Sequence, residues 1–97
     1  MKFTVTPEVV VAIHRLLSSR VFLRLYRTLC SEGRMNVSAL ARKAGCINRR
    51  AAALLRILAG MGVVEERFRS GLHIFKIKDG ELAELLKRTV EIIDSEG

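Results

Sequence analysis

The chain has 97 residues, a mass of 10.9 kDa and a formal charge of +7, with 17 Lys and Arg against 10 Asp and Glu. This length suits one domain, and the basic excess indicates a polyanionic partner, nucleic acid above all. The longest uncharged stretch, residues 57–64, is far too short to span a membrane, and two cysteines do not make a disulfide framework. We therefore expect a cytoplasmic protein with neither a membrane helix nor a signal peptide.

The first predicted helix covers residues 7–17 and follows residues 1–5, which we expect to form a short extended arm. Thr6-Pro7-Glu8 marks its start, because Thr is a good N-cap, Pro suits the first helical position and an acid favours the first turn. The helix is apolar on nearly every side, so it should be buried. A second subunit is the economical way to bury it in so short a chain.

Two more helices follow in the first half of the chain. Ser18-Ser19 starts a helix over 20–31 that ends at Glu32-Gly33. Its inward face consists of Val21, Phe22, Leu25, Tyr26 and Leu29. Asn36 then caps a short helix over 37–43, and Gly45 ends it after two turns.

The second half combines helices with a hairpin. Asn48 is expected to cap a helix over 49–60, with Ala51, Leu55 and Leu58 as its buried stripe. Residues 63–69 and 72–78 are predicted strands, joined by a tight turn at Ser70-Gly71. Asp79 is expected to cap a last helix over 80–95.

A short helix, a glycine turn, a helix that opens with arginines and a hairpin together predict a helix-turn-helix with a wing. Arg49, Ala52, Ala53 and Arg56 recur at spacings of three and four, opposite the buried stripe. The two alanines let the helix approach base edges in a groove about 12 Å wide, and Arg binds guanine with two hydrogen bonds. The predicted fold class is mainly α with a small β-hairpin, a single winged helix domain over 1–97 with extra N- and C-terminal helices.

Residues 17–78 resemble the winged helix-turn-helix regulators, closest to the ArsR-like and related archaeal groups. The resemblance rests on the leucine spacing in 17–29, 37–45 and 48–58, and on Gly62-Val63-Val64 and Gly71 to Phe75. It implies that helix 49–60 enters the major groove while the hairpin touches flanking DNA. The DNA-contacting residues that it implies are Arg42, Lys43, Asn48, Arg49, Arg50, Ala52, Ala53, Arg56, Arg67, Arg69, Ser70 and Gly71.

The chain departs from that family in ways that bear on metals. Residues 37–43 contain no Cys, His, Asp or Glu, so the family's paired-cysteine metal motif is missing. Neither His14 nor His73 has a second ligand at zinc spacing. Cys30 and Cys46 are expected as small core residues. Since no catalytic constellation or phosphate-binding glycine loop stands out, we expect neither a cofactor nor enzymatic activity.

The two ends of the chain differ in charge. Residues 1–78 carry 15 basic and 4 acidic side chains, whereas residues 79–97 carry 2 basic and 6 acidic ones. The acidic last helix should therefore be turned away from DNA. We expect the two terminal helices to form a homodimer through Val9, Val10, Ile13, Leu16, Leu82, Leu86, Val90 and Ile93.

These expectations together favour a homodimeric, sequence-specific regulator of transcription that binds double-stranded DNA. Two alternatives remain open. One is a winged helix adaptor in a transcription or replication complex, which would use its apolar terminal helices to contact a partner. The other is an architectural protein that coats DNA without regard to sequence.

Overall fold

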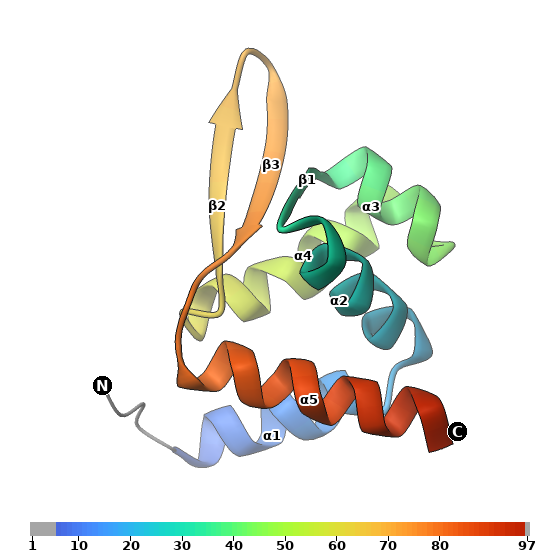
Figure 1. The fold of residues 1–97 in the computed structure, drawn as a ribbon. Helices are drawn as coiled ribbons and strands as arrows, with labels where there is room; N and C mark the ends of the chain where they lie inside the picture. The colour runs from blue at the N-terminus through green and yellow to red at the C-terminus, as the bar shows by residue number, and fades with distance from the viewer. Residues whose placement is uncertain (1–5, 97) are drawn as a thin grey trace.

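The structure, a computed structural model, describes residues 6–96, which form five helices and a three-stranded sheet (Figure 1). The elements are α1 (Pro7–Leu17), α2 (Arg20–Glu32), β1 (Arg34–Asn36), α3 (Val37–Ala44), α4 (Asn48–Gly60), β2 (Val64–Arg69), β3 (Leu72–Ile77) and α5 (Glu81–Glu96). The arm expected over residues 1–5 lies outside the described residues. The predicted class, a mainly α winged helix-turn-helix with extra terminal helices, is confirmed.

Three predicted helix starts are confirmed by side-chain caps. In each, an oxygen of the cap residue accepts a hydrogen bond from a backbone N–H of the first turn. The pairs are Thr6 with Val9 at 3.2 Å, Ser19 with Phe22 at 3.2 Å and Asn36 with Ala39 at 2.9 Å. Local sequence therefore decides where these helices begin.

The caps predicted at Asn48 and Asp79 are wrong. Ile47 occupies the cap position of α4 and makes no side-chain cap bond, while the Asn48 amide donates instead to Ser38 Oγ of α3, 2.9 Å away. Helix α5 begins at Glu81, so Asp79 lies one residue before the cap position. The Asn48 side chain is therefore bound to Ser38 of α3 and does not cap its own helix, α4.

The sheet has the strand order β1-β3-β2 and is antiparallel throughout. The predicted hairpin is present, with Arg69 opposite Leu72 at its tip. Ser70 and Gly71 both have positive φ, 50° and 79°, as a two-residue turn with the twist of a hairpin requires. Strand β1 was not predicted, because three residues carry no usable pattern and only pairing with β3 makes them a strand.

The core is built around α2 and receives side chains from every helix. Its fully buried members include Phe22, Tyr26, Leu29, Leu40, Leu55, Leu58 and Phe75. Leu16 of α1 and Leu86 and Val90 of α5 are buried in the same core, which removes them from the dimer surface expected from the sequence. The hydroxyl of Tyr26 donates to the carbonyl oxygen of Ala83 at 2.8 Å and so joins α2 to α5.

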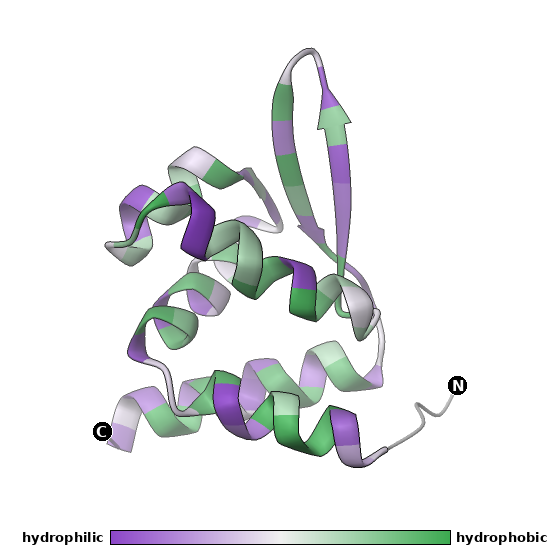
Figure 2. Ribbon diagram, turned by 180° about the vertical axis from the view of Figure 1, so that it is seen from behind, coloured by the Kyte–Doolittle hydropathy of each residue, from purple (hydrophilic) through white to green (hydrophobic). Residues whose placement is uncertain are grey.

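Helix α1 is less buried than predicted. Leu16 is its only fully buried residue, and Val10 and Val11 are 53% and 50% exposed. The helix packs on α2 along one side, and its many hydrophobic residues appear green in Figure 2. The exposed Val10 and Val11 form a hydrophobic strip that faces outward. A single copy of the described chain therefore leaves apolar surface uncovered.

The elements place the wing and the terminal helices at opposite ends of the molecule. The β2–β3 hairpin projects beyond the helices, while α1 and α5 lie at the far end (Figure 1). Between them stand α2, α3 and α4. Within residues 6–96 no helix combines the length and hydrophobicity that crossing a membrane requires.

The Tyr26 hydrogen bond yields a stability prediction. Tyr26→Phe removes the hydrogen bond from the buried hydroxyl to the Ala83 carbonyl, so the free energy of unfolding should fall by about 0.5–1.5 kcal/mol. Urea denaturation followed by circular dichroism measures it. Thr28→Ala is the control, because its hydroxyl bonds Arg24 O at an exposed site and its loss should change the value by less than about 0.5 kcal/mol. Equal effects of the two substitutions would contradict the assignment.

Candidate nucleic-acid interface

Helix α4 has one buried and one open face. Ala51, Leu55 and Leu58 are completely buried against the core. The opposite face exposes Arg49, Arg50, Ala53 and Arg56, with Ala52 half-buried at its edge. Helix α4 lies at the back in Figure 1 and at the front in Figure 2. The structure therefore brings the predicted contact residues of this helix onto one accessible surface.

The start of α4 is rich in positive charge. Its first turn contains Arg49 and Arg50, no acidic residue and no side-chain cap. Free backbone N–H groups and a helix dipole already make this end positive, so two arginines there oppose the dipole by about 0.3–1 kcal/mol each. The same arrangement suits an anion such as a phosphate group.

The turn between α3 and α4 holds the two helices in a fixed arrangement. Gly45 adopts a left-handed conformation with φ 75°, and the next N–H, from Cys46, bonds the Ala41 carbonyl at 3.0 Å. The Asn48–Ser38 bond links the starts of both helices. Arg42 and Lys43 are exposed in the last turn of α3, so their positive charges lie beside this turn.

The wing carries its predicted residues in the open. Arg67, Arg69, Ser70 and Gly71 are all exposed. The Arg67 Nε donates to Glu65 Oε2 of the same strand at 2.8 Å, which partly offsets its charge. Sequence reasoning missed that Phe68, 70% exposed, stands among these arginines.

A carboxylate that the sequence reasoning passed over connects the wing to α4. Glu66 Oε2 of β2 accepts hydrogen bonds from Arg56 Nε of α4, at 3.2 Å, and from His73 Nε2 of β3, at 2.5 Å. Burial opposes ionisation of this carboxyl, but these two partners outweigh it and hold the pKa of Glu66 below its usual value. The sequence did contain a hint of this role, because Glu65 and Glu66 are the only acidic residues between residues 33 and 78, a segment otherwise rich in Lys and Arg.

The imidazole that bonds Glu66 belongs to an aromatic stack. The ring of His73 lies parallel to that of Phe68, with centroids 4.4 Å apart, and tilted against the buried Phe75 at 4.7 Å. The stack runs from the core toward the wing tip and fixes the orientation of His73. The carboxylate of Glu66 is therefore anchored on a rigid part of the hairpin.

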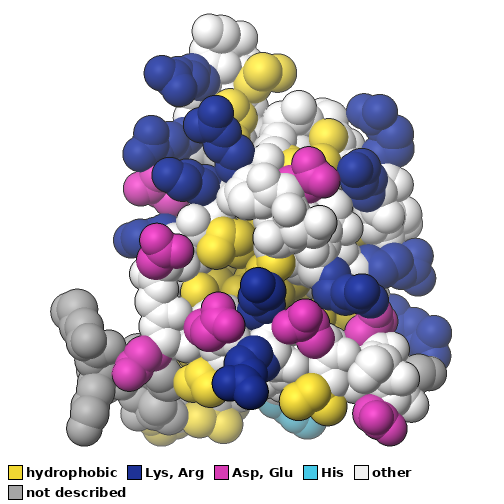
Figure 3. Space-filling model, in the orientation of Figure 1, with side chains coloured by type: hydrophobic (Ala, Val, Ile, Leu, Met, Phe, Trp, Pro, Cys, Tyr) yellow, Lys and Arg dark blue, Asp and Glu magenta, His cyan; other side chains and the backbone are white. Residues whose placement is uncertain are grey.

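Charge is unevenly distributed over the face shown in Figure 3. Lys and Arg side chains gather around the wing and along the side opposite to it, while most Asp and Glu side chains lie over α5 in the lower half. One acidic member of α5, Asp94, forms an ion pair with Arg27 of α2. The basic and acidic ends expected from the sequence are thus also separate in space.

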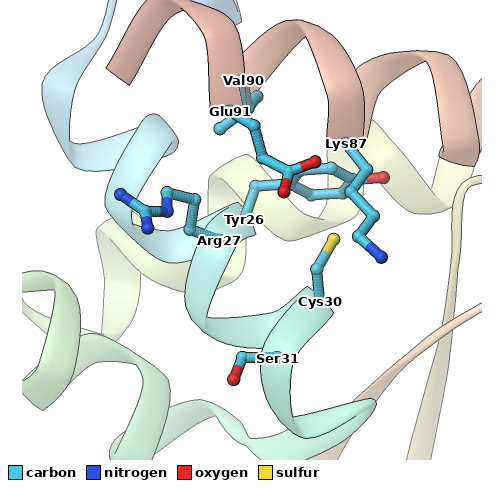
Figure 4. Close-up of a pocket in the computed structure, with 7 residues that line it drawn as sticks. All are labelled: Tyr26, Arg27, Cys30, Ser31, Lys87, Val90 and Glu91. Carbon is cyan, nitrogen blue, oxygen red and sulfur yellow. The ribbon is translucent and has the colours of Figure 1, made fainter. Parts of the chain in front are cut away.

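A small pocket lies away from α4, between α2 and α5. It measures about 190 Å³ and is lined by Tyr26, Arg27, Cys30, Ser31, Lys87, Val90 and Glu91 (Figure 4). Ligand pockets for drug-sized molecules run from about 300 to 1,000 Å³, so this one is too small for such a molecule. Burial raises the pKa of the Cys30 thiol, which keeps it protonated and weakly nucleophilic at neutral pH.

The two cysteines lie where small side chains fit. Cys30 and Cys46 are both half-buried, unbridged and packed against the hydrophobic core, as expected for small core residues. Among residues 6–96 no group of three or more His, Cys, Asp and Glu side chains is placed to hold a metal ion.

Comparison with solved structures identifies the architecture. A scan against protein-family models and a search of curated proteins found no match. The antimony-specific transcriptional repressor AntR superimposes with a TM-score of 0.70 at 20% identity, over 98% of this chain and 88% of that one. A homodimeric winged helix-turn-helix DNA-binding domain from Mycobacterium bovis, described as a possible ArsR-family regulator, gives 0.67 at 26% identity, over 90% and 79%.

A third similar structure is the transcriptional repressor BigR from Xylella fastidiosa, with a TM-score of 0.65 at 26% identity, over 88% of this chain and 86% of that one. All three neighbours are named as regulators, and none as an enzyme. The chain therefore has the winged helix-turn-helix fold of ArsR-like transcriptional regulators. The resemblance seen in the sequence is confirmed at the level of the fold.

The lowered pKa of Glu66 yields a pH prediction. A carboxyl whose pKa is lowered by folding stabilises the protein above its ordinary value, 4.5 here, and that contribution is lost as the pH falls further. The melting temperature of the wild type should therefore drop more steeply below pH 4.5 than that of Glu66→Gln. Thermal unfolding across this range measures it, and parallel curves for the two proteins would contradict the assignment.

Proposed function

We propose that this protein is a transcriptional regulator that binds double-stranded DNA. The proposal depends on helix α4, which has one buried and one exposed side. Its buried side packs on the core, while Arg49, Arg50 and Arg56 extend into solvent. A rigid helix with outward arginines fits the width of the major groove, and Arg pairs with guanine O6 and N7. The similarity to repressors of the same fold supports this role.

Helix α4 would act as the recognition helix, with base edges facing Arg49, Ala52, Ala53 and Arg56. Two small side chains between the arginines allow the close approach that base contact requires. Arg42 and Lys43 would bind phosphates beside the groove, which sets the position of the helix without reading sequence. The arginines of the wing, Arg67 and Arg69, would lie on flanking DNA.

The protein would act as a homodimer through its terminal helices. Helix α1 exposes Val10 and Val11, and helix α5 exposes Leu85 and Ile92. The half-buried members of the expected surface are Val9, Ile13, Leu82 and Ile93. Because these helices lie opposite the wing, a second copy bound there would cover apolar surface and leave the wing free (Figure 1). Two-fold symmetry would place the half-sites about 34 Å apart.

The exposed apolar strip also favours a second candidate, an adaptor that docks a different protein on α1 and α5. Such a protein would be monomeric when purified and would not shift duplex DNA. Selection of bound oligonucleotides from a random duplex pool separates the candidates, because only a sequence-specific dimer enriches one palindromic site. An architectural DNA protein would bind the pool without enrichment.

Substitution of two basic residues tests the division between base and phosphate contacts. Arg49→Ala should weaken binding to the selected site by about 1–3 kcal/mol and relax base preference near that position, because it removes a base contact. Lys43→Ala should weaken binding to all duplexes alike. Fluorescence anisotropy on selected and scrambled duplexes measures both.

The salt dependence of the same titrations gives a second check. If about six Lys and Arg per dimer neutralise phosphates, the logarithm of the binding constant should fall against the logarithm of salt concentration with a slope of about −5.

Unchanged affinity in both Arg49→Ala and Arg56→Ala would mean that α4 is not the DNA-binding helix.

Charged residues in the proposed dimer surface test the oligomeric state. Val10→Glu or Ile92→Glu would bury an unpaired carboxylate, so the dimer dissociation constant should rise by more than about 100-fold in sedimentation measurements. Leu72→Glu is the matched control, because Leu72 is 51% exposed but belongs to the wing. A wild-type protein that sediments as a monomer would overturn the dimer.

A further inference from the structure

An acidic side chain stands in the middle of the proposed DNA surface. Glu66 is 26% exposed, between Arg56 at 59% and His73 at 17%. A carboxylate so placed repels DNA phosphates and by itself weakens binding, so its presence there needs a structural explanation. Its three-element contact, joining α4, β2 and β3, indicates what that explanation is.

The contact with Glu66 leaves the two terminal amino groups of the Arg56 guanidinium available to bind a base. Arg56 contacts Glu66 through Nε alone among its described contacts, and a guanidinium has two further amino groups beyond Nε. Those terminal groups are the pair that can bind guanine O6 and N7 side by side. A bond at Nε therefore orients the guanidinium plane without consuming the donors that read a base.

The carboxylate is itself held in place from the wing. Glu66 lies opposite Phe75 and Phe68 lies opposite His73, so Glu66 and His73 are diagonal neighbours on one face of the hairpin. His73 donates from Nε2 and is fixed by its stacking between Phe68 and Phe75. An ionised carboxylate only accepts hydrogen bonds, so both partners must donate to it.

We propose that Glu66 is a positioning residue for Arg56: anchored by His73, it holds the guanidinium toward base edges and withholds it from DNA phosphates. The inference rests on the proposed function. Its consequence is sequence discrimination, because a restrained arginine binds the matching base and gains little from a phosphate elsewhere. The wing thus sets the specificity of the recognition helix through one carboxylate.

The test compares variants for binding to a selected site and to a scrambled duplex. Glu66→Gln frees Arg56 and removes a negative charge, so affinity for scrambled DNA should rise and the specific-to-scrambled ratio should fall about tenfold. The salt slope should steepen by about 0.9 for each subunit whose Arg56 gains a phosphate. Circular dichroism of Glu66→Gln should match that of the wild type, which checks that the variant is folded.

Two further variants separate position from charge. Glu65→Gln makes the same charge change one residue away, where the carboxylate bonds Arg67 of its own strand, and should raise both affinities without changing their ratio. Glu66→Asp keeps the charge but shortens the side chain, which releases Arg56, so it should lower the ratio and steepen the salt slope although the net charge is unchanged. Glu66→Asp with full discrimination would overturn the proposal.

A double substitution tests whether Glu66 acts through Arg56. In an Arg56→Ala background, Glu66→Gln should leave the ratio unchanged; a tenfold fall there would overturn the proposal. Equal specific-to-scrambled ratios for Glu66→Gln and Glu65→Gln would also overturn the proposal. If Arg49→Ala still lowered specific binding in that case, the proposed function would remain intact. A wild type that binds no duplex would overturn both.

Discussion

The burial of one side of α4 is the constraint on which the rest of the structure depends. Ala51, Leu55 and Leu58 enter a core filled largely by α2, and this fixes both the axis and the rotation of the helix. A helix held along one stripe must present the opposite stripe outward. The exposure of Arg49 and Arg56 is therefore a consequence of packing, and loss of that packing would free the whole basic surface to rotate.

The basic surface is not a uniform field of positive charge. Glu65 and Glu66 each engage an arginine, one within its own strand and one on a different element. An unrestrained arginine binds any phosphate, whereas a restrained one favours a partner at a fixed position. A regulator that must find one site among many benefits from fewer free charges and more fixed ones, and the Arg56–Glu66 contact has that character.

Local patterns predicted most of the fold. Thr6, Ser19 and Asn36 make their own cap bonds, and Ser70-Gly71 forms the predicted tight turn. The apolar periodicity of α2 and α4 predicts most of their buried residues, although in α2 Val21 is only half-buried and the buried Leu23 was missed. The exposed arginines of α4 follow from that periodicity. Where contacts from elsewhere in the chain intervene, prediction failed: Asn48 bonds Ser38 rather than capping its helix, and β1 exists only through its pairing with β3.

The amino-acid sequence by itself determined the order of the five helices and the hairpin, the basic and acidic ends and the outward face of α4, because each depends on residue types at short, regular spacings. The tertiary structure alone decided which residues of the terminal helices are core, with Leu16 and Val90 inside and Val10 outside. It alone decided that Glu66 meets Arg56, ten residues away on another element. Both outcomes depend on how elements dock, which is a property of shape that local spacing does not encode.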